Sequence, residues 1–142
     1  MIAFLCSIQV FAQQNRVKVE EIIGPQLNGI IQTALDLAEL QPYYHAKNNV
    51  ISKQVVFEEE APFTAKYLNA LSKFNKPVLV LNHSEIAKQK VKKYLSIHDW
   101  DITMNDCRLE LNFNGEKILI SYTLRKTNNK WVITGFKIVP QK

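Results

Sequence analysis

Residues 106–139 read DCRLELNFNGEKILISYTLRKTNNKWVITGFKIV, and this stretch decides the fold class of the chain. Apolar and polar residues alternate on both sides of Asn114-Gly115, which is typical of antiparallel strands with one buried face. An Asn-Gly pair between alternating residues is also the strongest short-range signal of a two-residue hairpin turn. A second polar turn follows near residues 127–129, so the stretch predicts a three-stranded β-meander.

A two-residue turn at Asn114-Gly115 would determine which residues of the first two strands lie opposite each other. The apolar rows of both strands then fall on one face, so the turn chemistry and the side-chain pattern agree. The expected pairs are Phe113 with Glu116, Leu111 with Ile118, Leu109 with Ile120, and Cys107 with Tyr122.

The second turn fits a three-residue loop at Thr127-Asn128-Asn129, or a five-residue loop of equal parity. A loop of even length would instead place Lys137 or Gly135 against the apolar row. The three-residue loop predicts that Leu124 lies opposite Val132, Ile120 opposite Phe136, and Ile118 opposite Ile138.

The opposite face of this meander is only half polar. With the three-residue loop it carries Leu119, Trp131 and Ile133 among charged residues. Apolar residues of this kind need cover. The face is therefore a candidate interface for the N-terminal region or for a second copy of the chain.

The residues before the meander alternate between helix and strand patterns. Apolar residues at helical spacing predict a first helix over residues 26–40, with Pro25 in its first turn and Pro42 ending it. Further patterns predict a strand over 50–57, a helix over 62–75, a buried strand over 78–81, and a helix from Ser84 through Leu95. The expected class is α+β, with N-terminal helices packed on a curved antiparallel sheet that ends in the meander.

The end of the chain resembles NTF2-like and cystatin-like domains over about residues 100–139. The likeness rests on GEKILISYTLRKTNNKWVITGFKIV, in which a polar turn is followed by Lys130-Trp131 and alternating apolar residues. The resemblance implies a curved sheet wrapped around helices, a pocket between them, and dimers formed through the sheet. Such domains include enzymes, binding proteins and accessory domains, so the resemblance does not give the function.

The first twelve residues, MIAFLCSIQVFA, carry no charge and have the length of the apolar part of a secretory signal. Val10 and Ala12 suit cleavage after residue 12, although no basic residue precedes the run. We therefore expect a cleaved signal at 1–12, a single domain at 13–142, and export to the periplasm or the medium. The alternative is an apolar element that docks on the core, because the run is too short to span a bilayer.

The 142 residues carry a net charge of +5, from fifteen Lys and three Arg against thirteen acidic residues. Proteins that read nucleic acids usually depend on Arg, so this balance disfavours a nucleic-acid partner. The abundance of Lys, Asn and Ile suggests an AT-rich bacterial genome. After cleavage, Cys107 would be the one remaining cysteine, and its place in the alternating row predicts a buried thiol without a disulfide.

Several polar residues are candidates for a site. Tyr43, Tyr44, His45, Trp100 and Tyr122 are the expected pocket residues. Tyr43, Tyr44 and Trp100 lie near predicted element ends, where aromatic side chains either line a pocket mouth or cap the core. The cluster His98-Asp99-Trp100-Asp101 has metal-ligating groups but more simply forms a connection. Four lysines, Lys88, Lys90, Lys92 and Lys93, would attract an anionic partner or form the solvated face of a helix.

No motif for catalysis, a metal or a cofactor is recognisable in the sequence. The leading hypothesis is an exported protein that binds a ligand or partner without catalysis. The alternatives are a pocket enzyme with His45, His83 or Asp101 as acid or base, and a homodimeric structural domain that uses the second sheet face.

Overall fold

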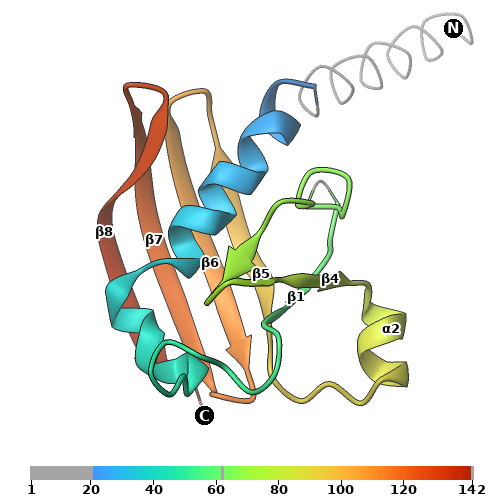
Figure 1. The fold of residues 1–142 in the computed structure, drawn as a ribbon. Coiled ribbons are helices and arrows are strands. Elements are labelled where there is room, and N and C mark those ends of the chain that lie inside the picture. The colour runs from blue at the N-terminus through green and yellow to red at the C-terminus, as the bar shows by residue number, and fades with distance from the viewer. Residues whose placement is uncertain (1–20, 62, 142) are drawn as a thin grey trace, which may run out of the picture.

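A computed structural model describes residues 21–61 and 63–141, which Figure 1 shows. The signal predicted at residues 1–12 lies outside the described residues and stays a prediction. A helix, here called the N-terminal helix, covers residues 21–35. After it come the 3-10 helix η1 (Ala38–Tyr44), strands β1 (Val56–Glu58), β2 (Ser72–Lys73), β3 (Lys76–Pro77) and β4 (Leu79–Leu81), helix α2 (His83–Lys88), and strands β5 (Tyr94–Ile102), β6 (Asp106–Asn114), β7 (Ile118–Thr127) and β8 (Lys130–Pro140).

The main sheet has six strands in the order β4-β1-β5-β6-β7-β8. Strand β1 runs parallel to both of its neighbours, whereas β5 to β8 form antiparallel pairs. The α+β class and the closing meander are confirmed, but the prediction of a wholly antiparallel sheet was wrong. Strands β2 and β3 form a separate hairpin.

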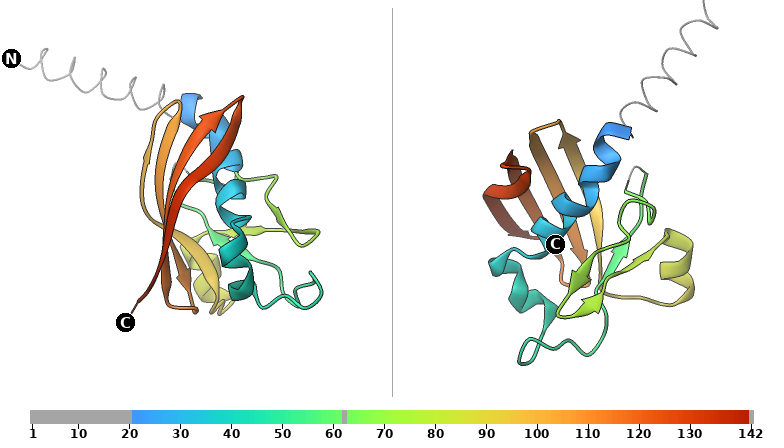
Figure 2. Two further views of the ribbon diagram at one scale, coloured as in Figure 1. Left: turned by 90° about the vertical axis from the view of Figure 1, so that its left-hand side faces the viewer. Right: turned by 45° about the horizontal axis from the view of Figure 1, so that its top comes forward.

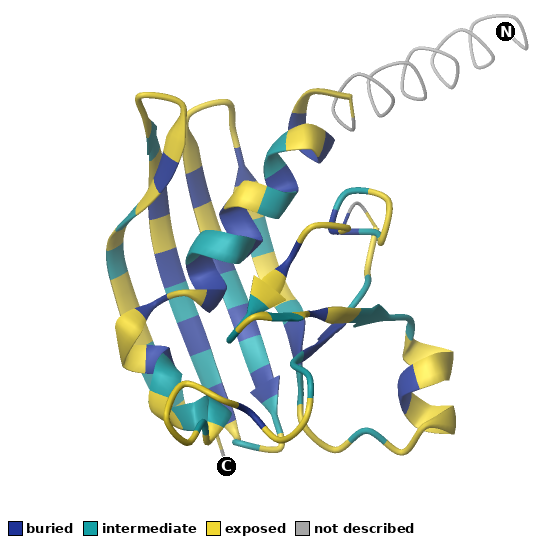
Figure 3. Ribbon diagram, in the orientation of Figure 1, coloured by how far each residue is buried: buried dark blue, intermediate teal, exposed yellow. Residues whose placement is uncertain are grey.

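The N-terminal helix crosses one face of the meander, as the views in Figure 2 show. Its apolar stripe is buried against the sheet, with Leu27, Ile30 and Leu35 each 0% exposed. Buried and exposed residues alternate along β6 and β7 in Figure 3, as expected for strands with one covered face. The core therefore lies between this helix and the sheet, and the other face of the meander carries no second layer among the described residues.

The N-terminal helix ends earlier than predicted. Its described part stops at residue 35, and Leu37 leaves the helical conformation with ψ 124°. Pro42 lies inside η1 and therefore does not end the first helix. The Gln41 side-chain amide donates to the carbonyls of Leu35 and Leu37 at this helix end, and the same carbonyls also accept from the Tyr44 hydroxyl and the Leu40 N–H, respectively.

The turn between β6 and β7 is longer than predicted. Phe113 lies opposite Ile118, so residues 114–117 form a four-residue turn and each predicted pair is displaced by two residues. A displacement by two keeps every side chain on its predicted face, and the expected row is indeed buried. The Asn114 side chain hydrogen-bonds the Ser96 hydroxyl of β5, a tertiary contact that the two-residue turn did not take into account.

The turn between β7 and β8 is shorter than predicted. Lys130 lies opposite Thr127, so Asn128 and Asn129 form a two-residue turn with φ angles of 52° and 61°. Asn tolerates this left-handed conformation, which a type I′ turn requires at both positions. The even loop length moves the start of β8 onto the face opposite to the one predicted.

This shift corrects the predicted interface. Trp131 and Ile133 lie on the helix-covered face, where Trp131 is only 9% exposed. The Thr33 hydroxyl of the N-terminal helix lies 3.5 Å from the Trp131 carbonyl. Leu119 stays on the open face, as predicted. Val132, which is 47% exposed, lies on the open face where Trp131 and Ile133 were predicted.

A β-bulge then reverses the shift. It lies between Thr123 and Leu124 of β7, and Thr134 is the extra residue on β8. The Thr134 hydroxyl donates to the Thr123 carbonyl at 3.2 Å, which anchors the bulge. Beyond it, Ile138 lies opposite Ile120, so the end of β8 faces the helix as expected, with partners displaced by two.

The helix predicted over residues 62–75 was wrong, because the described residues 63–75 contain turns and strand β2. The Phe74-Asn75 pair forms another two-residue turn with positive φ angles of 51° and 61°, and it joins β2 to β3. Phe63, Leu68 and Leu71 are nevertheless buried. These side chains fill the core from turns and an irregular backbone, so their spacing in the sequence did not indicate a helix.

The helix predicted from Ser84 through Leu95 forms only in part. Helix α2 begins after Asn82, whose side chain makes a capping box with Glu85. The helix ends at Lys88, and Leu95, predicted to be helical, belongs to β5.

Strand β5 also contains the cluster His98-Asp99-Trp100-Asp101, which was predicted to be a connection. A bulge between Ile97 and Asp99 interrupts the alternation of buried residues. Because of this irregularity, the sequence pattern did not indicate a strand here.

The two early strands are shorter than their predicted ranges. The predicted strand over 50–57 reduces to β1, because a turn at Asn48-Asn49 leaves Val50 60% exposed. The strand predicted over 78–81 is confirmed as β4. It lies at the sheet edge, however, where Leu79 is 37% exposed and not buried as predicted.

Candidate functional site

A groove opens where the parallel strands β1 and β5 begin. These strands are paired at a single position, Phe57 opposite Leu95. Residues 51–56 lead into β1, residues 89–94 lead into β5, and the two segments border a groove of about 1080 Å³. Figure 1 shows both segments at the lower end of the sheet. We call this feature the β1–β5 groove.

The β1–β5 groove has an apolar floor. Four buried residues contribute to its lining, namely Ile51, Val56, Leu95 and Phe113. The exposed side chain of Leu79 at the sheet edge extends this surface. Ligand sites usually combine such apolar walls with a few well-placed polar groups.

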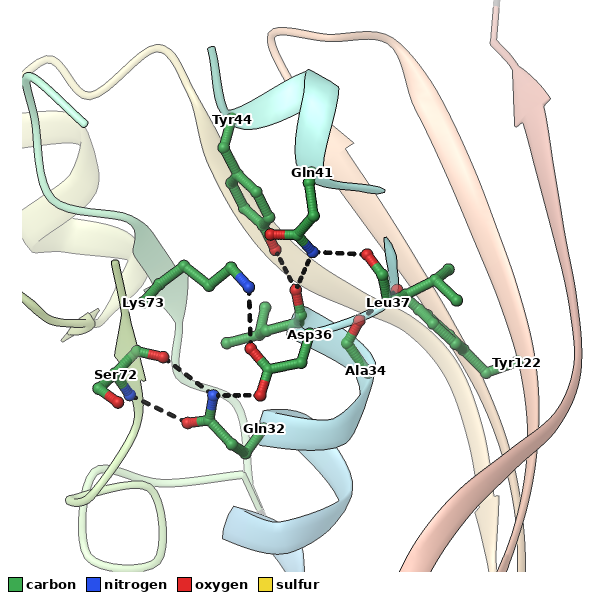
Figure 4. Close-up of polar contacts among 10 residues, drawn as sticks. Gln32, Ala34, Asp36, Leu37, Gln41, Tyr44, Ser72, Lys73 and Tyr122 are labelled. Atoms are coloured by element: carbon green, nitrogen blue, oxygen red, sulfur yellow. Dashed lines mark hydrogen bonds and ion pairs between the residues drawn. The ribbon is translucent and has the colours of Figure 1, made fainter. Parts of the chain in front are cut away.

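Tyr43 and Tyr44 of helix η1 and His45, which follows it, line the groove, so the structure brings together three of the five predicted pocket residues. Tyr44 is held in place by its hydroxyl, which donates to the Leu35 carbonyl at 3.0 Å (Figure 4). Its ring lies 5.6 Å from that of Phe113. Burial raises the pKa of the Tyr44 phenol far above its usual range, so this residue is a neutral wall of the groove.

Lysine side chains give the groove its charge. Five lysines line it, and no Asp or Glu does: Lys53, Lys76, Lys90, Lys92 and Lys93. Lys76 donates to the Ile51 carbonyl at 2.9 Å and thereby ties β3 to the groove border. Lys53, Lys90 and Lys92 form no ion pair with any residue of 21–61 or 63–141.

One carboxylate lies beside the groove and binds two of its lining residues. Glu116, in the β6–β7 turn, accepts from Lys93 at 2.7 Å and from His45 at 2.8 Å. The hydrogen bond from Lys93 lowers the pKa of Glu116 most, partly opposed by burial, and His45 lowers it further. Lys93 and His45 therefore bind a carboxylate of the chain itself at the border of the groove.

Gly115 makes this arrangement of the turn possible. A Cβ atom at this position would lie 2.6 Å from the Lys92 carbonyl oxygen, and the φ angle is +93°. An L residue would be strained by both the contact and the backbone conformation. Gly115 therefore lets the turn approach the lysine segment closely enough for Glu116 to reach Lys93.

Lys90 has an unusual backbone. It follows α2 with a left-handed φ of 54°, where helices most often place glycine. Its N–H donates to the Ala87 carbonyl, and the next N–H, of Val91, donates to Ile86. This Schellman motif turns the chain toward β5 and puts Lys90 on the groove.

The other two predicted pocket residues, Trp100 and Tyr122, do not line the β1–β5 groove. Trp100 packs edge-on against Phe63, with ring centroids 5.4 Å apart. Tyr122 is 2% exposed, and its hydroxyl donates to the Ala34 carbonyl of the N-terminal helix at 3.0 Å. Burial raises its pKa well above the usual range, so Tyr122 is a core residue with a satisfied hydroxyl.

The candidate acid–base residues lie at separate places. His45 contacts Glu116, whereas His83 on α2 lies 3.2 Å from Glu58. Asp101 lies on the open sheet face, 3.8 Å from Arg108. No shared acid–base pair forms from these three within the described part of the chain.

The remaining reactive groups are also separated or buried. His98 lies 3.8 Å from Glu110 on the open face, and residues 21–61 and 63–141 contain no cluster suited to a metal ion. Cys107 is 3% exposed, and burial raises the pKa of its thiol to about 12. A thiol of this kind is unreactive near neutral pH, and its predicted burial is confirmed.

A smaller hollow of about 290 Å³ lies on the open sheet face. Its lining contains Asp99 and Glu110 together with Arg108 and Lys137. The two acidic residues lie opposite each other on β5 and β6, and the two basic residues belong to β6 and β8, so the lining carries both signs in equal number. This hollow therefore has no preference for one sign of ligand charge.

Three charged residues, two in the groove lining and one beside it, were not recognised from the sequence. Lys53 and Lys76 are isolated lysines, and Glu116 was expected to lie opposite Phe113 in a strand. Lys53 lies in the middle of the strand predicted over 50–57, so nothing in the sequence connected these three residues. Lys90, Lys92 and Lys93 were recognised as a basic run, but on a helix face that does not form there.

No family model, characterised protein or solved structure matches this chain. Within the described residues, no helix has both the length and the apolar character needed to cross a membrane.

Proposed function

We propose that this chain is a binding protein without catalytic activity, and that it holds an anionic ligand in the β1–β5 groove. The charge of the lining carries the proposal, since five lysines and no carboxylate face the groove. Like charges gathered around one cavity repel each other, and an anion relieves that repulsion. Lys53, Lys90 and Lys92 are the residues that would contact it.

The size and the floor of the groove support a ligand of appreciable size. Ligand sites usually enclose about 300–1,000 Å³, and the groove, at about 1080 Å³, lies just above this range. The apolar floor would bury hydrocarbon parts of the ligand while the lysines meet its charges. The ammonium groups are point charges on long stems and accept carboxylate or phosphate in varied geometries.

The contact between Lys93 and Glu116 supports the same ligand chemistry. At 2.7 Å it shows that a lysine of this border binds a carboxylate in the folded chain. The imidazole in the lining, that of His45, is engaged by the same carboxylate at 2.8 Å. The groove therefore offers charge and shape to a ligand, and no free acid–base pair.

The test is a titration of the isotope-labelled chain with citrate and, separately, with tripolyphosphate at low ionic strength, followed by amide NMR. We expect the largest shifts at residues 51–56 and 89–94. A triple variant, Lys53→Gln, Lys90→Gln and Lys92→Gln, should bind at least about tenfold more weakly, because three charges at the site are lost. Added salt should weaken the binding of the unaltered chain.

The matched control removes three lysines elsewhere: Lys66→Gln, Lys130→Gln and Lys137→Gln. None of them lines the groove, and all three are exposed. This variant changes the net charge by the same amount as the groove variant. Because its lysines lie outside the groove, it should keep the affinity for the anion within about twofold. Equal weakening by both variants, or shifts centred on the open sheet face, would overturn the proposal.

A further inference from the structure

The β1–β5 groove has the features of a site for one kind of anion, and this step rests on the function proposed above. We infer that its occupant is an extended acidic peptide segment, with acidic and apolar residues in alternation, that lies along residues 51–56. The inference combines the distribution of charge, the apolar floor and the free backbone groups of this segment.

The lysines are spread along both borders of the groove. Lys53 belongs to the segment that leads into β1, whereas Lys90 and Lys92 belong to the segment that leads into β5. A ligand with a single anionic group would compensate one border and leave the other uncompensated. The distribution therefore favours several negative charges spaced along a chain.

The apolar floor favours a polyanion that also carries apolar groups. Ile51, Val56 and Leu95 are buried apolar residues that line the groove together with the lysines. An extended peptide sends successive side chains to opposite sides. Apolar residues can therefore pack on the floor while the acidic residues between them meet the lysines. A nucleic acid has no aliphatic face to bury, and the groove lining contains no Arg to contact its phosphates in bidentate fashion.

The backbone of the β1 border has free hydrogen-bond donors. The N–H groups of Ser52, Lys53 and Gln54 have no hydrogen-bond acceptor among the described residues. No backbone hydrogen bond connects 51–54 with 90–93 in this part of the chain. Ser52 and Lys53 form a bend, so this border is not a regular strand edge, but the carbonyls of an extended peptide can accept from its free N–H groups while side-chain contacts give specificity.

The probe is a synthetic octapeptide of alternating Glu and Val with blocked ends. Its comparators are an isomer with four Glu followed by four Val, an alternating Lys-Val octapeptide, and a short oligothymidylate. We expect the alternating acidic peptide to bind at least about tenfold more tightly than its isomer or the oligonucleotide, and the Lys-Val peptide not to bind. The amide protons of Ser52, Lys53 and Gln54 should exchange more slowly in the complex.

The lysine variants described above separate this inference from the proposed function. The Lys53, Lys90 and Lys92 variant should lose the peptide, and the Lys66, Lys130 and Lys137 variant should retain it. If the oligonucleotide or tripolyphosphate binds in the groove at least as tightly as the peptide, the peptide inference is overturned while the groove remains an anion site. If none of the anions shifts the groove resonances, both proposals fail.

Discussion

At the residue scale, an added Cβ atom would have opposite effects at two glycines of this chain. Gly115 lies at φ +93°, and the Lys92 carbonyl oxygen is 2.6 Å from the position that a Cβ would take. Gly29 lies inside the N-terminal helix, where a Cβ would meet only the Trp131 ring at 3.5 Å, an ordinary contact distance. The first position requires glycine for both its backbone angle and its close approach, and the second does not.

We predict that Gly115→Ala destabilises the chain by at least about 2 kcal/mol, because the left-handed backbone and the contact with Lys92 both oppose a side chain. Urea unfolding monitored by circular dichroism measures the change. Gly29→Ala is the control and should stabilise by about 0.5–1 kcal/mol, since Ala favours helix more than Gly does. Equal effects of the two substitutions would contradict the structure around Gly115.

At the scale of the element, helix α2 has a favourable N-terminal cap but an unfavourable backbone conformation just after its C-terminus. Asn82 and Glu85 form a capping box at the first turn. At the other end Lys90 occupies the left-handed position that glycine favours. Strain of this kind often marks a residue retained for its side chain, and Lys90 faces the β1–β5 groove.

We predict that Lys90→Gly increases the free energy of unfolding by about 1 kcal/mol, because glycine adopts this conformation without cost. The same substitution should weaken tripolyphosphate binding, since it removes a groove charge. Urea unfolding and NMR titration measure the two effects on one variant. Lys88→Gly, inside α2, is the control and should instead lose about 1 kcal/mol. A loss of stability in Lys90→Gly would show that the strain is absent.

At the scale of the whole molecule, Glu116 connects three parts of the chain that are distant in sequence. It belongs to the β6–β7 turn and binds His45 at the end of η1 and Lys93 at the start of β5. Its pKa is lowered in the folded state, first by the Lys93 hydrogen bond. Folding therefore favours the ionised form of this carboxylate.

The sign of the pH dependence follows from that shift. The contribution of Glu116 is fully present above the ordinary Glu pKa of about 4.3 and is lost as the pH falls through the lower folded value. We predict that Glu116→Gln is less stable than the unaltered chain at pH 6 and that the difference shrinks toward pH 3. Thermal unfolding across this range measures it. A difference that stays constant with pH would contradict the proposed linkage.

Lys93 provides the partner for a double-mutant cycle. If Lys93 acts on stability through Glu116, then Lys93→Gln should have little further effect in the Glu116→Gln background. Additive losses at pH 6 would show that the two side chains act independently.

The sequence by itself determined the α+β class, the meander, the buried face of β6 and β7, and the burial of Cys107. These features depend on alternation or helical spacing within one segment, and one covered face imposes that pattern directly. Tyr43, Tyr44 and His45 were predicted together and all three line the β1–β5 groove, because residues adjacent in sequence stay together in any fold.

Only the tertiary structure decided the turn lengths, the face of Trp131 and the groove. A turn can change by one or two residues at small local cost, so contacts such as Asn114 with Ser96, or Glu116 with Lys93, select the length. The short helix α2 and the bulge in β5 likewise follow from packing that local propensity does not contain. The groove arises where two segments far apart in sequence lead into neighbouring parallel strands, so lysines as distant as Lys53 and Lys90 become a site only after folding.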